Sequence, residues 1–140
     1  MKDFILFFQN HPMLSIALIV TLILLFIVEW ARVKSNARRI SPLEATQLIN
    51  HEDAVVVDIR HPDAFKNGHI IGAISLPFAD LEKQYKKLEK YIKKPIILVC
   101  ATGLESPRAA QFLLKNGYHV LIHGGGIRAW KEADMPLVKN

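Results

Sequence analysis

The sequence predicts an α/β domain, in which helices cover both faces of a parallel sheet, preceded by one N-terminal transmembrane helix. Two observations predict the domain. Residues 54–58 and 95–100 form short apolar runs rich in Val and Ile, as in strands buried on both faces, and helical patterns alternate with such runs. A third observation predicts the transmembrane helix, because residues 13–28 contain no charged side chain.

The N-terminal segment has the length of a membrane span. Residues 12–31 would form a helix of about 30 Å, close to the hydrocarbon thickness of a bilayer. A cleaved signal peptide and a buried core helix are the alternatives. The best cleavage site, at 35–37, is embedded among basic residues, and the apolar run is long for a core helix at the extreme N-terminus. We therefore expect a membrane anchor over residues 1–31, with the transmembrane helix at about 12–31.

Basic residues after the span set its expected orientation. Residues 32–39 form a basic juxtamembrane linker, whereas only Lys2 precedes the span. The positive-inside rule then places the N-terminus outside and the C-terminal domain in the cytoplasm, in a single-pass protein of the cell inner membrane. Much of the net charge of +5 lies in this N-terminal part, so the charge does not indicate a nucleic-acid partner.

Residues 40–140 carry the signals of successive helices. Ser41 can cap a helix over about 42–50, Pro42 suits its first position, and Glu44 can reach back to the cap. A short helix or turn over 62–67 ends at Gly68. The other expected helices are 80–91, with an apolar stripe of Leu81, Tyr85, Leu88 and Ile92, then 106–116, and finally 126–133.

Strands are expected between these helices at 54–58, 73–77, 95–100 and 119–122. Strands that alternate with helices pair in parallel, and the ligands of such sheets bind beyond the carboxyl ends of the strands. Cys100 lies at one of these ends.

Cys100 is the single cysteine, which excludes an intramolecular disulfide, a Cys-x-x-Cys redox pair and a cysteine zinc site. Residues 101–105 form a short loop after it, and a helix begins near Ser106. Such a loop directs several backbone N–H groups at one point, where they bind an anion and stabilise a thiolate nucleophile. From these residues alone, a buried structural cysteine and a catalytic cysteine remain equal alternatives.

Several spaced motifs resemble a rhodanese-like domain over nearly all of residues 40–140. They are Asp58-Ile59-Arg60, Phe65, the run 68–74, Cys100 at a strand end, and the run 125–130 followed by Pro136. The resemblance implies a compact α/β fold with a central parallel sheet. It also implies sulfur transfer through a cysteine persulfide, without a metal or an organic cofactor. A membrane helix ahead of one such domain is similar to a known bacterial arrangement.

The resemblance assigns roles to individual residues. Cys100 is the sulfur-accepting nucleophile, and the anion-cradling loop consists of Ala101, Thr102, Gly103, Leu104 and Glu105. The expected structural residues are Asp58 with Arg60, as an ion pair and turn, and His69 with Gly72, which order the turn before the next strand. The implied partners are a small sulfur donor such as thiosulfate or a persulfide, a thiol or protein acceptor, membrane lipid and a membrane-protein partner.

One residue departs from the family pattern. Many active members have Arg at the last loop position, where this chain has Glu105, which repels a dianion such as thiosulfate. Arg108, one helical turn later, is expected to pair with Glu105 and offset part of this repulsion. The sequence therefore supports two hypotheses: a membrane-anchored sulfurtransferase, or a catalytically weak interaction module that docks a membrane or cytoplasmic partner.

Other motifs are interpreted more simply. A cysteine phosphatase needs Arg where this chain has Ser106, so that activity is not expected. The run 124–126 lacks the Lys and Ser/Thr of a phosphate loop and is interpreted as a tight turn. His119 and His123 would lie about 13 Å apart on a strand, too far to share a metal ion. The lysines of 83–94 form either a solvated helix face or a contact with anionic lipid.

Overall fold

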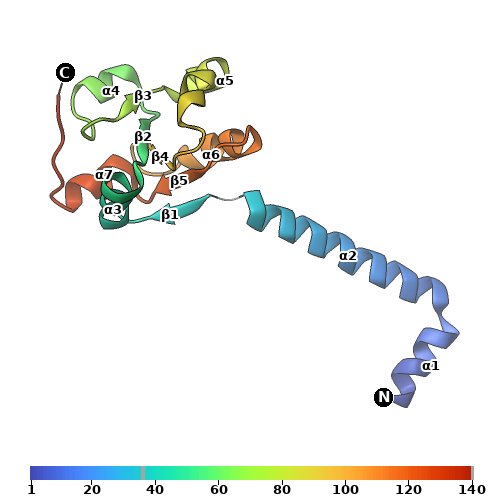
Figure 1. The fold of residues 1–140 in the computed structure, drawn as a ribbon. Coiled ribbons are helices and arrows are strands. Elements are labelled where there is room, and N and C mark those ends of the chain that lie inside the picture. Colours follow the sequence, from blue (N-terminus) through green and yellow to red (C-terminus); the bar gives the residue numbers. More distant parts are fainter. Residues whose placement is uncertain (36, 140) are drawn as a thin grey trace. The chain divides into compact units, whose positions relative to one another are not determined.

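The computed structural model describes residues 1–35 and 37–139. The chain divides into two compact units, Met1–Ser35 and Asn36–Asn140 (Figure 1). Each unit is described by itself below.

The first unit consists of the helices α1 (Lys2–Asn10) and α2 (Pro12–Ser35). Pro12 opens α2, where its missing N–H leaves no internal hydrogen bond unmade. The stretch Pro12–Trp30 is a candidate membrane span by length and composition, with a mean hydropathy of 2.6. Residues 32–35, which the sequence places in the linker, continue α2 as helix.

The second unit is built on a five-stranded sheet with the order β1-β5-β4-β2-β3. The strands are β1 (Arg38–Ile40), β2 (Val55–Asp58), β3 (Ile74–Ser75), β4 (Ile96–Val99) and β5 (Val120–His123). Every neighbouring pair in this sheet is parallel. The predicted α/β class and parallel sheet are therefore confirmed.

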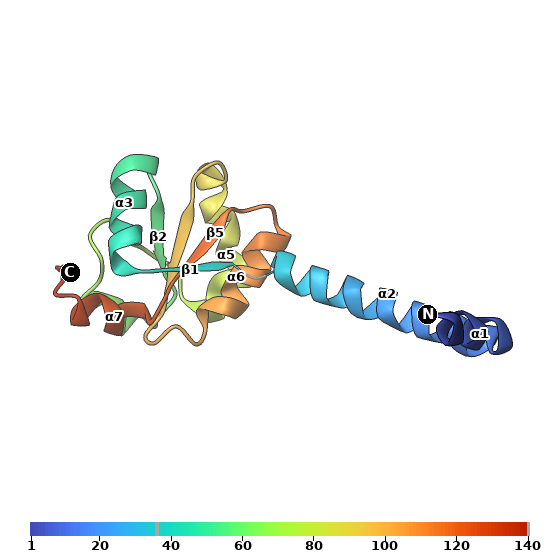
Figure 2. The same cartoon turned by 90° about the horizontal axis from the view of Figure 1, so that it is seen from below.

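Alternate residues of the strands point to opposite faces of the sheet, and helices cover both faces (Figure 2). On one face Val57, Leu98 and Ile122 pack with residues of α5 (Leu81–Gln84) and α6 (Ser106–Lys115). On the other face Val56 and Val99 pack with residues of α3 (Pro42–Glu52) and α7 (Gly126–Glu132). The short helix α4 (Pro62–Lys66) follows β2.

The strand β1 was not predicted. Arg38 and Arg39, which the sequence places in the linker, pair with Leu121 and Ile122 of β5. Only Ile40 of this strand is buried, so β1 carries no apolar run by which a sequence pattern reveals a strand. The basic linker therefore extends less far than expected, and the sheet begins before residue 40.

The segment expected as one helix over 80–91 is mostly 3₁₀-helical. It consists of η1 (Phe78–Asp80), the single turn α5 and η2 (Tyr85–Tyr91). A 3₁₀-helix has three residues per turn, so Tyr85, Leu88 and Tyr91 lie on one face and pack against the core. Ile92, which an α-helical stripe would bury, is 41% exposed.

The structure confirms the expected start of α3 and one of its two expected capping interactions. Ser41 Oγ accepts a hydrogen bond of 3.2 Å from the backbone N–H of Glu44, and Pro42 occupies the first turn. The side chain of Glu44 lies 3.7 Å from Arg38 of β1 in an exposed ion pair.

Candidate active site

Cys100 follows the central strand β4 directly, at the carboxyl end of the sheet. Its side chain is buried, with 2% of the residue exposed. The backbone N–H of Gly103 donates a hydrogen bond of 2.9 Å to Cys100 Sγ. This bond closes the first turn of the loop over the sulfur, and it is stronger with a thiolate acceptor than with a thiol.

The remaining amides of the loop are open. In the described part of the chain, the backbone N–H groups of Ala101, Thr102, Leu104 and Glu105 have no protein acceptor. The loop runs directly into α6, so its amides and the positive end of that helix lie together. An anion seated above Cys100 would meet donors rather than carbonyl oxygens.

The loop carbonyls are held by the first turn of α7. Ile127 N–H donates to Cys100 O at 2.9 Å, and Arg128 N–H donates to Ala101 O at 3.2 Å. A Cβ on Gly126 would lie 2.2 Å from Cys100 O, so a residue with a side chain cannot occupy this position without displacing the loop. Gly126, the last residue of the turn expected over 124–126, and the first turn of α7 therefore support the cysteine loop.

A pocket of about 390 Å³ opens over the sulfur. It is lined by Cys100, Ala101, Thr102, Leu104 and Glu105 of the loop, and by Arg60, His61 and Ala64. The second group follows β2, which is paired with β4, so the carboxyl ends of two adjacent strands build the pocket. Leu104 is 83% exposed.

His61 is a pocket residue that the sequence analysis missed. It is the N-cap of α4, and its Nδ1 accepts a hydrogen bond of 3.2 Å from Asp63 N–H. In the neutral ring this bond assigns the proton to Nε2. In the sequence His61 directly follows the Asp58-Ile59-Arg60 motif. This position indicates a pocket residue only once it is known that β2 adjoins β4.

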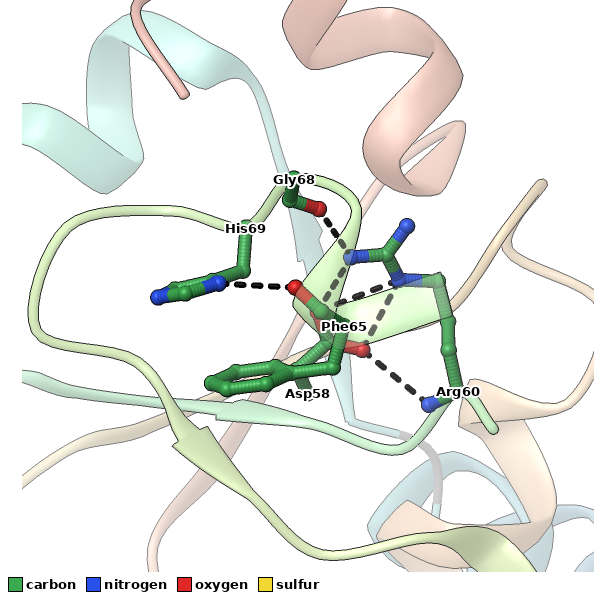
Figure 3. Close-up of polar contacts among 5 residues, drawn as sticks. All are labelled: Asp58, Arg60, Phe65, Gly68 and His69. Carbon is green, nitrogen blue, oxygen red and sulfur yellow. Dashed lines mark hydrogen bonds and ion pairs between the residues drawn. The ribbon is translucent and has the colours of Figure 1, made fainter. Parts of the chain in front are cut away.

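Arg60 lines the same pocket but is held by structural bonds (Figure 3). Its guanidinium donates to both carboxylate oxygens of Asp58, at 2.7–3.1 Å, and to Gly68 O at 2.6 Å. The Asp58 carboxylate is 1% exposed and also accepts a bond of 3.0 Å from Arg60 N–H. Asp58 and Arg60 thus form the ion pair and turn that the sequence indicates.

His69 and Gly72 order the following segment. His69 Nδ1 hydrogen-bonds Phe65 O at 2.8 Å, and the two rings stack with centroids 3.8 Å apart (Figure 3). His69 also exchanges backbone bonds with Val138, which fixes the C-terminal segment. Gly72 has φ +77° in the turn before β3.

The expected pair between Glu105 and Arg108 does not form. In the described residues Glu105 has no ion-pair partner, and Arg108 lines a different pocket, with Leu81 and Glu82 of α5 and Phe112 of α6. Glu105 precedes α6 as its N-cap, whereas Arg108 lies on the face of α6 that meets α5. The negative charge at the pocket rim is therefore not offset by Arg108.

Two other polar residues are fully buried beside the loop. Ser106, at the position where a phosphatase would carry Arg, and His123, at the end of β5, have side-chain polar atoms without a partner in the described residues. Burial lowers the pKa of the His123 imidazole below its ordinary value. Neither residue lines the pocket over Cys100.

Known proteins resemble the chain in sequence and in fold. The Rhodanese-like domain family matches residues 41–133. The uncharacterized protein YibN of Escherichia coli (strain K12) is 37% identical over 141 residues, covering 99% of each chain. The thiosulfate sulfurtransferase GlpE of Pseudoalteromonas translucida (strain TAC 125) is 36% identical over 97 residues, which cover 69% of this chain and 90% of GlpE.

A solved structure shows the same fold. The rhodanese-related protein of Thermoplasma volcanium superposes with a TM-score of 0.68 and 30% sequence identity, covering 74% of this chain and 99% of that one. The family match at residues 41–133 includes Cys100 with its loop and the four strands β2 to β5. The chain therefore belongs to the rhodanese-like domain family.

Proposed function

We propose that the protein is a membrane-anchored sulfurtransferase that carries sulfane sulfur as a persulfide on Cys100. In the first step the Cys100 thiolate attacks the outer sulfur of thiosulfate, the S–S bond of the donor breaks, and sulfite leaves with its electron pair. In the second step an acceptor thiolate attacks the terminal sulfur of the persulfide, and Cys100 leaves as the thiolate. Neither step needs an external oxidant or reductant.

The observation that carries this proposal is the environment of Cys100. Gly103 N–H donates to its Sγ, and the other loop amides have no protein acceptor among the described residues. Donors fixed around a sulfur stabilise the anionic forms that the cycle requires, the thiolate and the persulfide anion. The similarity to the thiosulfate sulfurtransferase GlpE supports the same chemistry.

A second function is favoured by the rim of the pocket. Glu105 places a negative charge beside the loop, and Leu104 exposes an apolar side chain next to it. A protein partner can use both, whereas an inorganic dianion is repelled by the first. The alternative is therefore an interaction module with weak sulfur transfer, which docks a membrane or cytoplasmic protein through this loop.

Replacing Cys100 with Ser separates the two functions. The hydroxyl is close in size to the thiol but cannot hold a persulfide, so Cys100→Ser should abolish sulfur transfer from thiosulfate to a thiol acceptor and leave the circular-dichroism spectrum unchanged. A parent protein that transfers no sulfur from thiosulfate or from a low-molecular-weight persulfide would favour the interaction module. Equal activity of parent and variant would contradict the proposed role of Cys100.

We also propose that α2 anchors the chain in the inner membrane with the C-terminal domain in the cytoplasm. The hydroxyls of Ser15 and Thr21 donate to the backbone carbonyls of His11 and Ala17, four residues earlier in each case, so these polar groups need no water. The match to YibN covers 99% of the chain and thus includes this segment. Protease added to intact spheroplasts should leave the domain undigested, and digestion would contradict the orientation.

A further inference from the structure

The segment 80–94 presents a concentrated positive charge. Six of its side chains are lysines, all exposed, and together we call them the lysine face: Lys83, Lys86, Lys87, Lys90, Lys93 and Lys94. Among the described ion pairs, none joins these lysines to a carboxylate, and Lys87 donates only to Gln84 Oε1, at 2.8 Å. Their charges are therefore available to an anionic partner.

The charge of the domain is distributed unevenly. The segment 80–94 holds six basic and three acidic residues, a net of +3. The rest of residues 40–140 holds seven basic and eight acidic residues, a net of −1. The positive potential of the domain is thus concentrated on one segment rather than spread over the surface.

The 3₁₀ geometry of η2 explains why this face combines basic and apolar groups. Tyr85, Leu88 and Tyr91 are directed to the core at every third position, which leaves the lysines between them outward. Lys90 Nζ lies 5.0 Å from the ring centroid of Tyr91, and Ile92 is 41% exposed beside them. Lysine stems with an adjacent aromatic and an aliphatic side chain suit the boundary between lipid headgroups and acyl chains.

The chain enters the domain on the face of the sheet that η2 covers. Ala37, the first described residue of the second unit, packs against the same apolar cluster that buries Leu81 and Leu88. Ala37 follows Trp30, the end of the candidate span, by seven positions, so the connection is at most about 25 Å long. A tether of this length holds the domain at a high effective concentration over the bilayer.

We propose that the lysine face docks the domain onto an anionic lipid surface through the phosphate groups of the lipids. The partner is a bilayer, because the same chain carries a candidate span and the charge is accompanied by the exposed aliphatic side chain of Ile92. Basic residues near an anionic surface each favour docking by about fivefold. This inference rests on the proposed membrane span and does not depend on sulfur transfer.

The full chain in lipid nanodiscs tests this proposal. One preparation contains phosphatidylcholine alone and the other contains phosphatidylglycerol as well, and brief amine acetylation followed by mass spectrometry reads the accessibility of each lysine. We expect the lysine face to be labelled several-fold more slowly in anionic nanodiscs and the difference to vanish at high salt. The exposed Lys66 and Lys131, outside the face, should be labelled equally in both.

A matched pair of double variants completes the test. Lys86→Gln with Lys90→Gln should lower the ratio of docked to free domain by roughly 25-fold, whereas Lys66→Gln with Lys131→Gln should leave it unchanged. Equal labelling of the lysine face in both lipids would overturn the proposal. Release of the chain from neutral nanodiscs would contradict the span on which it rests. Neither result concerns the persulfide on Cys100, which is measured separately.

Discussion

Two turns at the carboxyl ends of neighbouring strands differ in how their polar groups are satisfied. After β2, the Asp58 carboxylate and the Arg60 guanidinium bind each other, and Arg60 also binds Gly68 O. After β4, in the described residues only Gly103 of the loop amides binds a protein atom, and that atom is Cys100 Sγ. In the first turn the charged side chains bind each other and the backbone, whereas in the second turn several N–H donors are left to bind a ligand.

This difference indicates that the turn after β2 supports the fold, whereas the loop after β4 provides groups for chemistry. A buried charged pair that keeps all its partners fixes the backbone around it, and removing one member leaves the other uncompensated. Ala101, Thr102 and Glu105 are exposed, so water can satisfy their amides until an anion replaces it. Substitutions in the first turn should therefore change mainly stability, and substitutions in the second should change mainly reactivity.

Breaking the ion pair in the turn after β2 should have the largest effect on stability. Asp58→Ala leaves the Arg60 guanidinium, 10% exposed, without its carboxylate and should lower the free energy of unfolding by about 3–5 kcal/mol. Urea denaturation followed by circular dichroism measures the change. Cys100→Ser is the matched variant in the open loop and should change the stability by less than about 1 kcal/mol. Similar losses for both variants would remove the distinction between the turns.

The close contact between Gly126 and the backbone carbonyl of Cys100 provides the next test. Gly126→Ala places a Cβ against Cys100 O at φ +59° and should cost about 3 kcal/mol or more, together with loss of sulfur loading. Gly72→Ala is its control, because φ is +77° but no atom lies within 4 Å of the added Cβ. That variant should cost only about 1–2 kcal/mol and keep sulfur loading. Equal losses in the two variants would show that the loop does not depend on this contact.

The charge at the pocket rim should change reactivity without changing the fold. Glu105→Arg replaces repulsion of thiosulfate by attraction and should raise the rate of Cys100 sulfur loading by roughly tenfold. The gain should shrink as salt is added, because Glu105 is exposed. The control is Glu52→Arg, an equal change of charge on an exposed residue of α3. An unchanged rate in Glu105→Arg would favour the interaction module.

Acid should weaken the domain through His123. Burial lowers the pKa of this imidazole in the folded state, so the unfolded chain binds a proton more readily. The stability that neutral His123 contributes is present above the unfolded value of about 6.5 and is lost as pH falls toward the folded value, with a slope of at most about 1.4 kcal/mol per pH unit. Urea denaturation at about pH 7.5 and about pH 5 should show a smaller loss for His123→Leu than for the parent. Equal losses would assign the acid sensitivity to other groups.

Sequence reasoning found the parts of the molecule that local patterns encode. The runs at β2 and β4 are apolar throughout, and the cap of α3 is readable from Ser41 and Pro42, so these elements were predicted. β1 was missed because only Ile40 carries an apolar signal, and its pairing with β5 depends on residues far along the chain. The 3₁₀ form of η2 escaped because periods of three and of 3.6 residues give similar patterns over one or two turns.

The candidate site was predicted only as far as it is local. Cys100 and its loop are contiguous, so strand end, loop and helix start were visible in the sequence. His61 and Gly126 belong to the site through strand order and loop packing, which a single sequence does not reveal. Arg108 was assigned to Glu105 from helical spacing, but the Arg108 side chain lines a pocket beside α5 instead, and which neighbour a side chain meets there depends on tertiary packing.

The intact mass of the purified protein after incubation with a sulfur donor tests the central claim most directly. Thiosulfate and a low-molecular-weight persulfide are each added to the parent and to Cys100→Ser, and excess donor is removed before mass spectrometry. We expect the parent to gain the mass of one sulfur atom, located on Cys100 by peptide mapping and removed by a thiol, and we expect Cys100→Ser to gain none. A parent that stays unmodified with both donors, or a variant that is modified equally, would contradict the assignment of Cys100 as the sulfur carrier.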